Sequence, residues 1–185
     1  ARGMGGASRP ARGPPSRLGS TTGQRILDAL RARIVRGECA PGTRLPTRSE
    51  LEKEFSTTPV TIQRTFDRLA DEGFIVAKGR QGTYVADRPP HLYRYGLVFP
   101  YQDRPDRPWS HFWTALATEA AAFSKRNGHE LTFFYGNETH LDIEAYQQLE
   151  RDVLAHRLAG LIFASKPFYL RGSPVLEAPG IPRVA

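Results

Sequence analysis

The order of the patterns in the first half of the chain constrains its fold more than any other feature. Apolar side chains recur at helical spacing over residues 24 to 36, in a shorter stretch over residues 49 to 55, and again from residue 58 to about residue 72. Two short apolar runs follow, over residues 74 to 77 and 83 to 86, and a glycine-containing turn joins them. Such a pair of runs is typical of a β-hairpin. The sequence therefore predicts three helices and a hairpin around one small core.

The third helical segment carries a clear start signal. Thr58 is suited to cap the helix and Pro59 to occupy its first turn. Three helices followed by a hairpin form the winged helix-turn-helix layout, in which one side of the third helix enters the major groove of DNA. The opposite side must then bury an apolar stripe, and that stripe is expected to consist of Ile62, Phe66 and Leu69.

Several side chains in this region suit contacts with DNA. A glutamine can pair with adenine, an arginine with guanine, and an apolar group can touch the thymine methyl. A basic hairpin tip suits the minor groove or the phosphate backbone. The candidates on the third helix are Thr58, Val60, Thr61, Gln63 and Arg64, and those on the hairpin turn are Lys78, Arg80 and Gln81.

Short motifs in this half occur in an order found in one known family. They cover residues 42–47, 50–51, 61–64, 69–75 and 82–85. Through them, the segment from about residue 24 to residue 86 resembles the GntR-type DNA-binding domain. The resemblance implies that the second helix begins beside phosphate contacts. The wing, which is usually Gly-x-Gly in that family, is stretched in this chain to residues 79–82. The resemblance adds four candidate DNA-binding residues, namely Arg44, Arg48, Ser49 and Gly82, and it keeps Arg80 as the tip of the wing.

The sequence departs from that family at one informative place. Members often carry Ser-Arg-Thr at the start of the recognition helix, whereas this chain has Thr58-Pro59-Val60. The basic contact usual at position 59 is missing. We therefore expect a base preference that differs from that of typical members.

The charge distribution supports a polyanionic partner for the N-terminal half. The chain has a formal net charge of +7, and its first 90 residues carry 16 basic and 9 acidic side chains, while the remainder carries ten of each. Residues 1 to 22 are rich in Gly, Pro, Arg and Ser and are expected to be disordered. The single cysteine, Cys39, excludes an intrachain disulfide. No apolar run approaches the roughly 18 residues of a membrane span, so we expect a cytoplasmic protein that joins the nucleoid when bound to DNA.

The second half follows a different pattern. After a linker over residues 89 to 92, apolar strand patterns alternate with helical patterns of about 15 residues, which predicts βαβ units and a parallel sheet. The motifs at residues 95–100, 112–116 and 158–164 make residues 93 to 185 resemble the periplasmic-binding-protein-like sensor of LacI/GalR regulators. The resemblance implies two lobes, of which this segment would supply part of the first. A GntR-type head on such a sensor resembles the arabinose-repressor kind of regulator.

Ligands of open α/β sheets bind beyond the carboxyl ends of the strands. That rule selects Tyr101 and Gln102 after the first strand, Asn137 after the second and Ser165 after the third. The resemblance to the sensor implies that Trp109 and Phe112 stack on a sugar ring, although core packing is an equally good interpretation of both.

The predicted fold class is an α+β winged helix-turn-helix domain over residues 23 to 88, followed by part of an α/β parallel-sheet domain. The predicted function is a sequence-specific transcriptional regulator, a repressor in our reading. It would bind operator DNA as a homodimer and respond to a small effector such as a sugar. No cofactor, metal site or catalytic residue is expected. Two alternatives stay open: a GntR-type head fused to an enzyme-like domain, and a DNA-binding protein without a sensor.

Overall fold

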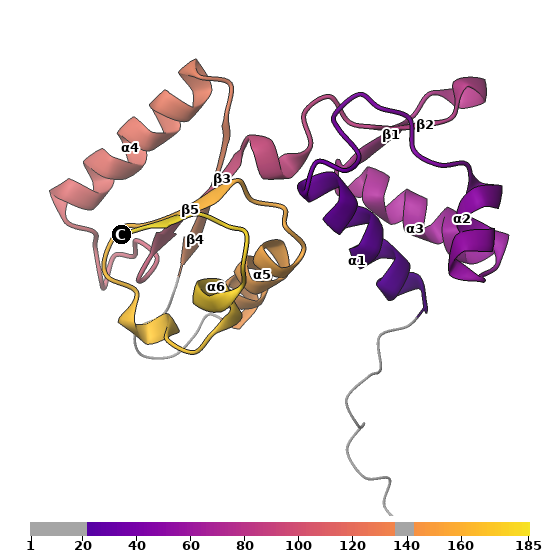
Figure 1. Cartoon of the computed structure of the whole chain (residues 1–185). Helices are drawn as coiled ribbons and strands as arrows, with labels where there is room; N and C mark the ends of the chain where they lie inside the picture. The colour runs from indigo at the N-terminus through magenta and orange to yellow at the C-terminus, as the bar shows by residue number, and fades with distance from the viewer. Residues whose placement is uncertain (1–21, 136–142) are drawn as a thin grey trace, which may run out of the picture.

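The computed structural model describes residues 22–135 and 143–185, which form an N-terminal helical domain and a C-terminal α/β domain (Figure 1). Three helices and a short antiparallel hairpin make up the first domain, as the sequence predicts. Its elements are α1 (Thr22–Val35), α2 (Arg48–Phe55), α3 (Pro59–Asp71), β1 (Ile75–Ala77), a 3-10 turn (Gly79–Gln81) and β2 (Thr83–Val85).

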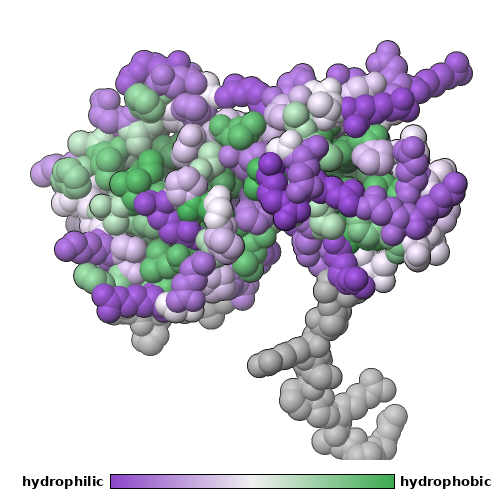
Figure 2. Space-filling model, viewed as in Figure 1, coloured by the Kyte–Doolittle hydropathy of each residue, from purple (hydrophilic) through white to green (hydrophobic). Residues whose placement is uncertain are grey.

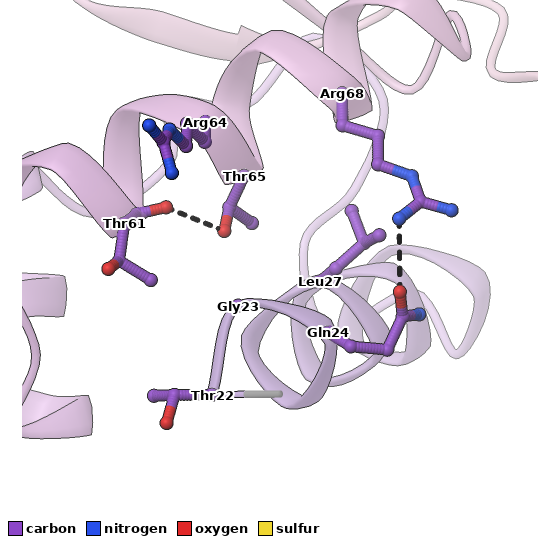
Figure 3. Close-up of a pocket in the computed structure, with 8 residues that line it drawn as sticks. All are labelled: Thr22, Gly23, Gln24, Leu27, Thr61, Arg64, Thr65 and Arg68. Carbon is purple, nitrogen blue, oxygen red and sulfur yellow. Dashed lines mark hydrogen bonds between the residues drawn. The ribbon is translucent and has the colours of Figure 1, made fainter. Parts of the chain in front are cut away.

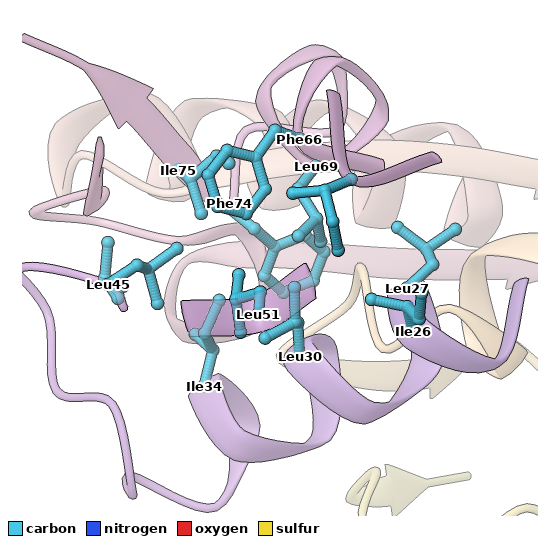
Figure 4. Close-up of a cluster of buried hydrophobic side chains, with 12 residues drawn as sticks. Ile26, Leu27, Leu30, Ile34, Leu45, Leu51, Phe66, Leu69, Phe74 and Ile75 are labelled. Carbon is cyan, nitrogen blue, oxygen red and sulfur yellow. The ribbon is translucent and has the colours of Figure 1, made fainter. Parts of the chain in front are cut away.

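One apolar core holds the N-terminal domain together (Figure 4). α1 contributes residues one turn apart, such as Leu27 and Leu30, which are each 1% exposed. α3 contributes the predicted stripe of Ile62, Phe66 and Leu69, and all three side chains are buried. Burial of that stripe against α1 and α2 fixes which side of α3 can face solvent.

One boundary of this domain differs from the sequence-based expectation. α1 begins at Thr22 rather than at residue 24, so Thr22 is helical although it was placed in the predicted disordered tail; the rest of that tail lies outside the described residues. The glycine-containing hairpin turn that the sequence predicts contains a 3-10 turn, and it is closed by the Lys78 amide, which donates to the Gly82 carbonyl at 2.8 Å. Gly79 and Gly82 adopt positive φ angles of 54° and 107°, which explains why this turn needs glycine at both ends.

A four-stranded parallel sheet forms the centre of the C-terminal domain, and its strand order is β4-β3-β5-β6. This arrangement confirms the predicted parallel sheet. The elements are η2 (Pro90–Leu92), β3 (Arg94–Phe99), α4 (His111–Arg126), β4 (Glu130–Tyr135), α5 (Ile143–Leu154), β5 (Gly160–Phe163), η3 (Phe168–Leu170), α6 (Pro174–Glu177) and β6 (Arg183–Val184).

The helices divide between the two faces of this sheet. α5 and α6 cover one face, and α4 lies on the other (Figure 1). The larger core is on the α5 side, where Leu149 and Val153 pack with strand residues such as Val98 and Phe134. α5 was expected to reach about residue 157 but ends at Leu154, because His156 adopts a left-handed φ of 50°.

The predicted linker over residues 89 to 92 is an ordered junction. Pro90–Leu92 forms a 3-10 turn, and the His91 ring stacks on Phe74 of the first domain, with the ring centroids 6.0 Å apart. Just before this turn, Arg88 donates through Nη2 to the Gly128 carbonyl of the second domain at 2.7 Å. The connection therefore contacts both domains.

Candidate nucleic-acid interface

The start of α3 is fixed by the cap that the sequence predicts. The Thr58 hydroxyl accepts a hydrogen bond from the Thr61 amide at 3.3 Å, and Pro59 is the first helical residue. Immediately upstream, α2 ends at Phe55, and its C-cap residue Ser56 has a φ of 48°, in the left-handed region. The short break between α2 and α3 therefore sets the angle of a helix-turn-helix.

The exposed side of α3 carries the predicted contact residues. Val60 is 58% exposed, unusually high for an apolar side chain at the start of a helix, and Arg64 is exposed too. Gln63 is half-buried, and its Nε2 donates to Asp67 Oδ1 at 2.6 Å. The amide of Gln63 is thus oriented by a carboxylate one turn away, which the sequence analysis did not anticipate.

The start of α2 lies on the same interface. Arg48 and Ser49 are the first two residues of α2, and both are exposed. A capping box precedes them, in which Glu50 accepts from the Thr47 amide at 2.7 Å and Thr47 accepts from the Glu50 amide. These hydrogen bonds, first from the backbone and then from the hydroxyl of Thr47, lower the pKa of Glu50.

Arg44 joins the second helix to the wing. Its backbone forms an isolated antiparallel bridge with Tyr84 of β2. Its side chain lies over Gly82, so that a Cβ built on Gly82 would come within 2.8 Å of Arg44 Nε. The two predicted contact residues Arg44 and Gly82 therefore depend on each other: the glycine leaves the space that the guanidinium fills.

The wing presents its basic side chains in an ordered turn. Lys78 lies over the Tyr84 ring with Nζ 4.7 Å from the centroid, and Tyr84 donates its hydroxyl hydrogen to the Gln81 carbonyl at 3.3 Å. Arg80 and Gln81 are exposed at the tip. Figure 2 shows hydrophilic residues over this end of the N-terminal domain. Tyr84 is a functional candidate that sequence reasoning missed, because its role comes from a contact within the folded hairpin.

A buried ion pair fixes α3 against α1. Arg31, only 3% exposed, donates to Glu72 Oε2 from Nε at 3.1 Å and from Nη2 at 2.5 Å. Glu72 also accepts from Arg68. The sequence offered no sign of this contact, since 41 residues separate its partners.

Some of the predicted effector residues lie at the carboxyl edge of the parallel sheet. Tyr101 and Gln102 follow β3, and Ser165 follows β5, whose strand is the direct neighbour of β3. Ser165 Oγ is buried and has no hydrogen-bond partner among the described residues. Asn137 lies outside the described residues, so its expected position stays a prediction.

The two aromatic candidates have different environments. Trp109 stacks on Phe99 with the ring centroids 4.2 Å apart, and its Nε1 donates to the Tyr101 carbonyl at 3.0 Å. Packing therefore holds one face of Trp109. Phe112, in contrast, is 67% exposed in the first turn of α4.

Additional side chains line this edge that sequence reasoning did not select. Asp103 Oδ1 accepts from the Trp109 amide at 2.7 Å, and Arg107 lies 3.7 Å from the centre of the Tyr101 ring. Burial, and then the nearby Asp103 carboxylate, raise the pKa of Tyr135. In the described ranges, no three His, Cys, Asp or Glu side chains gather in a way that could hold a metal ion. No helix in those ranges is long and apolar enough to cross a bilayer.

Comparison with known proteins decides what the first domain is. Residues 22–85 match the family model described as bacterial regulatory proteins, gntR family. The N-terminal domain is a GntR-type winged helix-turn-helix domain. The match begins at the first residue of α1 and ends at the last residue of β2, so it covers the whole GntR-type domain that the structure contains.

Curated relatives are similar to this chain over different lengths. The arabinose metabolism transcriptional repressor of Halalkalibacterium halodurans is 26% identical over 176 residues, which are 86% of this chain and 44% of the relative. The mannosyl-D-glycerate transport/metabolism system repressor MngR and the galactonate operon transcriptional repressor, both of Escherichia coli, are 36% and 38% identical over 64 residues each. Those residues are 35% of this chain and 27% and 28% of the two repressors, so this chain spans less than half of each of these relatives.

Two solved structures that are similar to this chain each cover less than half of it. A crystal structure of AraR(DBD) in complex with operator ORR3 is 25% identical, with a TM-score of 0.37, and the match covers 41% of this chain and 93% of that chain. A GntR family transcriptional regulator from Listeria monocytogenes is 26% identical, with a TM-score of 0.35, over 36% of this chain and 58% of that chain.

Proposed function

We propose that this chain is a sequence-specific transcriptional regulator that binds operator DNA through its GntR-type domain. One observation carries the proposal: α3 buries its apolar stripe and presents Thr58, Val60 and Gln63 on the outside, beside a basic wing with Arg80 at its tip. In this arrangement α3 enters the major groove, the start of α2 approaches phosphates, and the wing contacts the adjacent backbone or minor groove. Gln63 and Val60 supply the base-edge contacts, and Arg80 supplies charge.

The contacts divide into base readers and phosphate binders. Gln63 retains an amide oxygen and one amide hydrogen beyond the bond to Asp67, which is enough to pair with an adenine edge. Arg44, Arg48 and Lys78 are exposed cations, and Arg44 and Arg48 line one groove together with Gly79 and Gly82 of the wing. Such cations bind phosphates without regard to sequence and release counterions, so binding should weaken as salt concentration rises.

The α/β domain supports a second element of the proposal, an effector sensor of the periplasmic-binding-protein-like type. In the strand order β4-β3-β5-β6, β4 lies on one side of β3 and β5 on the other, so β3 marks a topological switch point. Such switch points in open parallel sheets form ligand clefts beyond the carboxyl ends of the strands. Tyr101, Trp109, Phe112 and the buried hydroxyl of Ser165 lie on segments that follow those ends. The alignment with the arabinose repressor of H. halodurans extends across this domain, which favours a sensor of that type over an enzyme-like domain.

A sensor would act on DNA binding by shifting a population. A sugar or related polar effector with different affinity for two arrangements of the sensor changes the placement of two GntR-type heads in a homodimer. Two heads on one duplex read two half-sites, so the operator should be roughly palindromic. Several relatives of this chain are repressors, so repression is the direction that we propose.

Selection of bound duplexes from a random pool tests this proposal directly. The expected result is enrichment of a short motif with an inverted repeat. Repeating the selection in the presence of arabinose, galactonate and other sugars or sugar acids tests the sensor. We expect at least one of these compounds to change the yield of bound DNA. Binding to DNA without any enriched motif would contradict sequence-specific recognition. An enriched motif whose binding responds to none of these effectors would favour a DNA-binding protein without a sensor.

A further inference from the structure

A groove lies between the start of α1 and the middle of α3, beside the proposed recognition surface (Figure 3). Its volume is about 440 Å³. The residues around it come from the first two turns of α1 and from two turns of α3. They are Thr22, Gly23, Gln24, Leu27, Thr61, Arg64, Thr65 and Arg68.

Two arginines, Arg64 and Arg68, line the groove, and no Asp or Glu is among its lining residues. Arg64 is exposed, and its guanidinium makes no hydrogen bond or ion pair with the residues that the structure describes. Arg68, one turn further along α3, donates to Gln24 Oε1 at 3.0 Å and to Glu72 Oε1 at 3.3 Å. Glu72 in turn is shared with the buried Arg31. Arg68 is thus held in place, and Arg64 stands beside it as an unpaired positive charge.

The groove adjoins the end of α3 that would enter the DNA. Thr61 lines the groove and also donates its amide to the Thr58 cap. A Cβ added to Gly23 would lie 3.7 Å from Thr61 Cγ2, so the start of α1 approaches the first turn of α3 at ordinary contact distance. A duplex that receives this turn of α3 in its major groove must pass a backbone strand along one flank of the helix.

We propose that this groove binds a backbone phosphate of the duplex, through the guanidinium of Arg64 with Arg68 held alongside. The inference rests on the proposed DNA-binding function. It changes the role that the sequence suggested for Arg64, because Arg64 lines a groove that residues of α1 share, on the flank of the recognition helix. Arg64 then sets the register of the complex, and Gln63 reads the sequence.

The charge requirement separates the two possible roles of Arg64. A phosphate contact depends on a cation, whereas a guanine contact depends on the bidentate fork of arginine. Dissociation constants should be measured over a range of salt concentrations on a random-sequence duplex and on a duplex from the selection. Arg64→Ala should weaken binding to both duplexes by the same factor and reduce the salt slope by about 0.9. Arg64→Lys should keep the slope.

Two matched controls accompany these variants. Arg36 follows the opposite end of α1 and its side chain is 64% exposed, so Arg36→Ala removes the same charge far from the groove and should leave the slope unchanged. Gly23→Asp introduces a carboxylate beside Arg64 while placing an acid in the first turn of α1, where it favours the helix. That variant should bind DNA several-fold more weakly than Gly23→Ala, although it melts at an equal or higher temperature.

The outcomes distinguish this inference from the function on which it rests. If the wild-type chain binds no DNA, the proposed function fails and the groove assignment fails with it. If the wild-type chain binds DNA and Arg64→Ala keeps the full salt slope, the groove assignment alone is wrong. A loss for Arg64→Lys confined to one base position would instead assign Arg64 to base reading, and equal binding by Gly23→Asp and Gly23→Ala would also overturn the assignment.

Discussion

Arg31 of α1 and Glu72, which follows the last residue of α3, form an ion pair whose side chains are only 4% and 8% exposed. The guanidinium of Arg31 also lies 5.9 Å from the centre of the Phe74 ring, at the entrance to the hairpin. This pair therefore ties together the first helix, the end of the recognition helix and the wing. The orientation of α3 relative to the rest of the domain depends on it.

Removal of the acid from this pair should cost stability. Glu72→Ala leaves the buried Arg31 without its main partner, and we expect a loss of roughly 3 kcal/mol in the free energy of unfolding. Urea unfolding followed by circular dichroism measures the change. Glu54→Ala is the matched control, since Arg33 and Glu54 form a pair that is 28% and 40% exposed, and its loss should cost under about 1 kcal/mol. Equal losses for the two variants would contradict the structural role of Arg31 and Glu72.

Gly82→Ala should weaken DNA binding by displacing Arg44. The new Cβ would come within 2.8 Å of Arg44 Nε, and the φ of 107° at this position is strained for any residue with a side chain. We expect a stability loss of about 1–3 kcal/mol together with weaker binding to every duplex. Gly37→Ala is the control, because Gly37 has a φ of 78° and no neighbour within 4 Å of an added Cβ. It should lose stability through strain alone, and a comparable loss of DNA affinity in both variants would argue against the contact between Gly82 and Arg44.

Gln63→Ala and Arg80→Ala should affect DNA binding in different ways. Loss of the Gln63 amide should relax the preference at one base position, at a cost of about 1–3 kcal/mol on the selected duplex. Loss of the exposed wing cation Arg80 should weaken binding to specific and random duplexes alike. Competition experiments with single-base variants of the selected duplex measure both effects. Asp67→Asn offers a further comparison, since it keeps the shape of the partner of Gln63 but not its charge. If both alanine variants lose the same affinity on specific and random DNA, the division into base reader and phosphate binder is wrong.

Stability should decrease with falling pH through two histidines near the junction of the domains. Burial, and then the nearby His156, lower the pKa of His91. Burial, and then the nearby Arg31, lower the pKa of His156, and Asp28 has a smaller opposite effect. In the unfolded chain the two imidazoles take up protons as the pH falls through 6.5, the ordinary pKa of histidine. In the folded protein both rings stay neutral at that pH because their pKa values are lower. The free energy of unfolding should therefore be highest above pH 6.5 and fall as the pH is lowered from there.

Urea unfolding at pH 7.5 and pH 5.5 measures this dependence. The double variant His91→Gln and His156→Gln should show a smaller difference between the two pH values. The exposed His111→Gln serves as the control and should behave like the wild-type protein. An undiminished pH dependence in the double variant would assign the effect to other groups.

The sequence determined the local structure of the first domain well. Thr58 and Pro59 start α3 as their types predict, because a cap and a fixed φ act within one helical turn. The buried stripe of Ile62, Phe66 and Leu69 follows from helical periodicity alone. The parallel sheet of the second domain could likewise be predicted from the alternation of strand and helix patterns.

Only the tertiary structure decided how these parts act on one another. Arg31 and Glu72, Arg44 and Gly82, and Gly23 and Thr61 are each distant in the chain, and their contacts depend on the angles at which the helices and the wing pack. Such contacts leave no periodic signal in the sequence, because each depends on one side chain reaching one specific neighbour across the fold. For the same reason the sequence placed Arg64 among the base readers, and only the packing of α1 against α3 forms the groove that Arg64 lines.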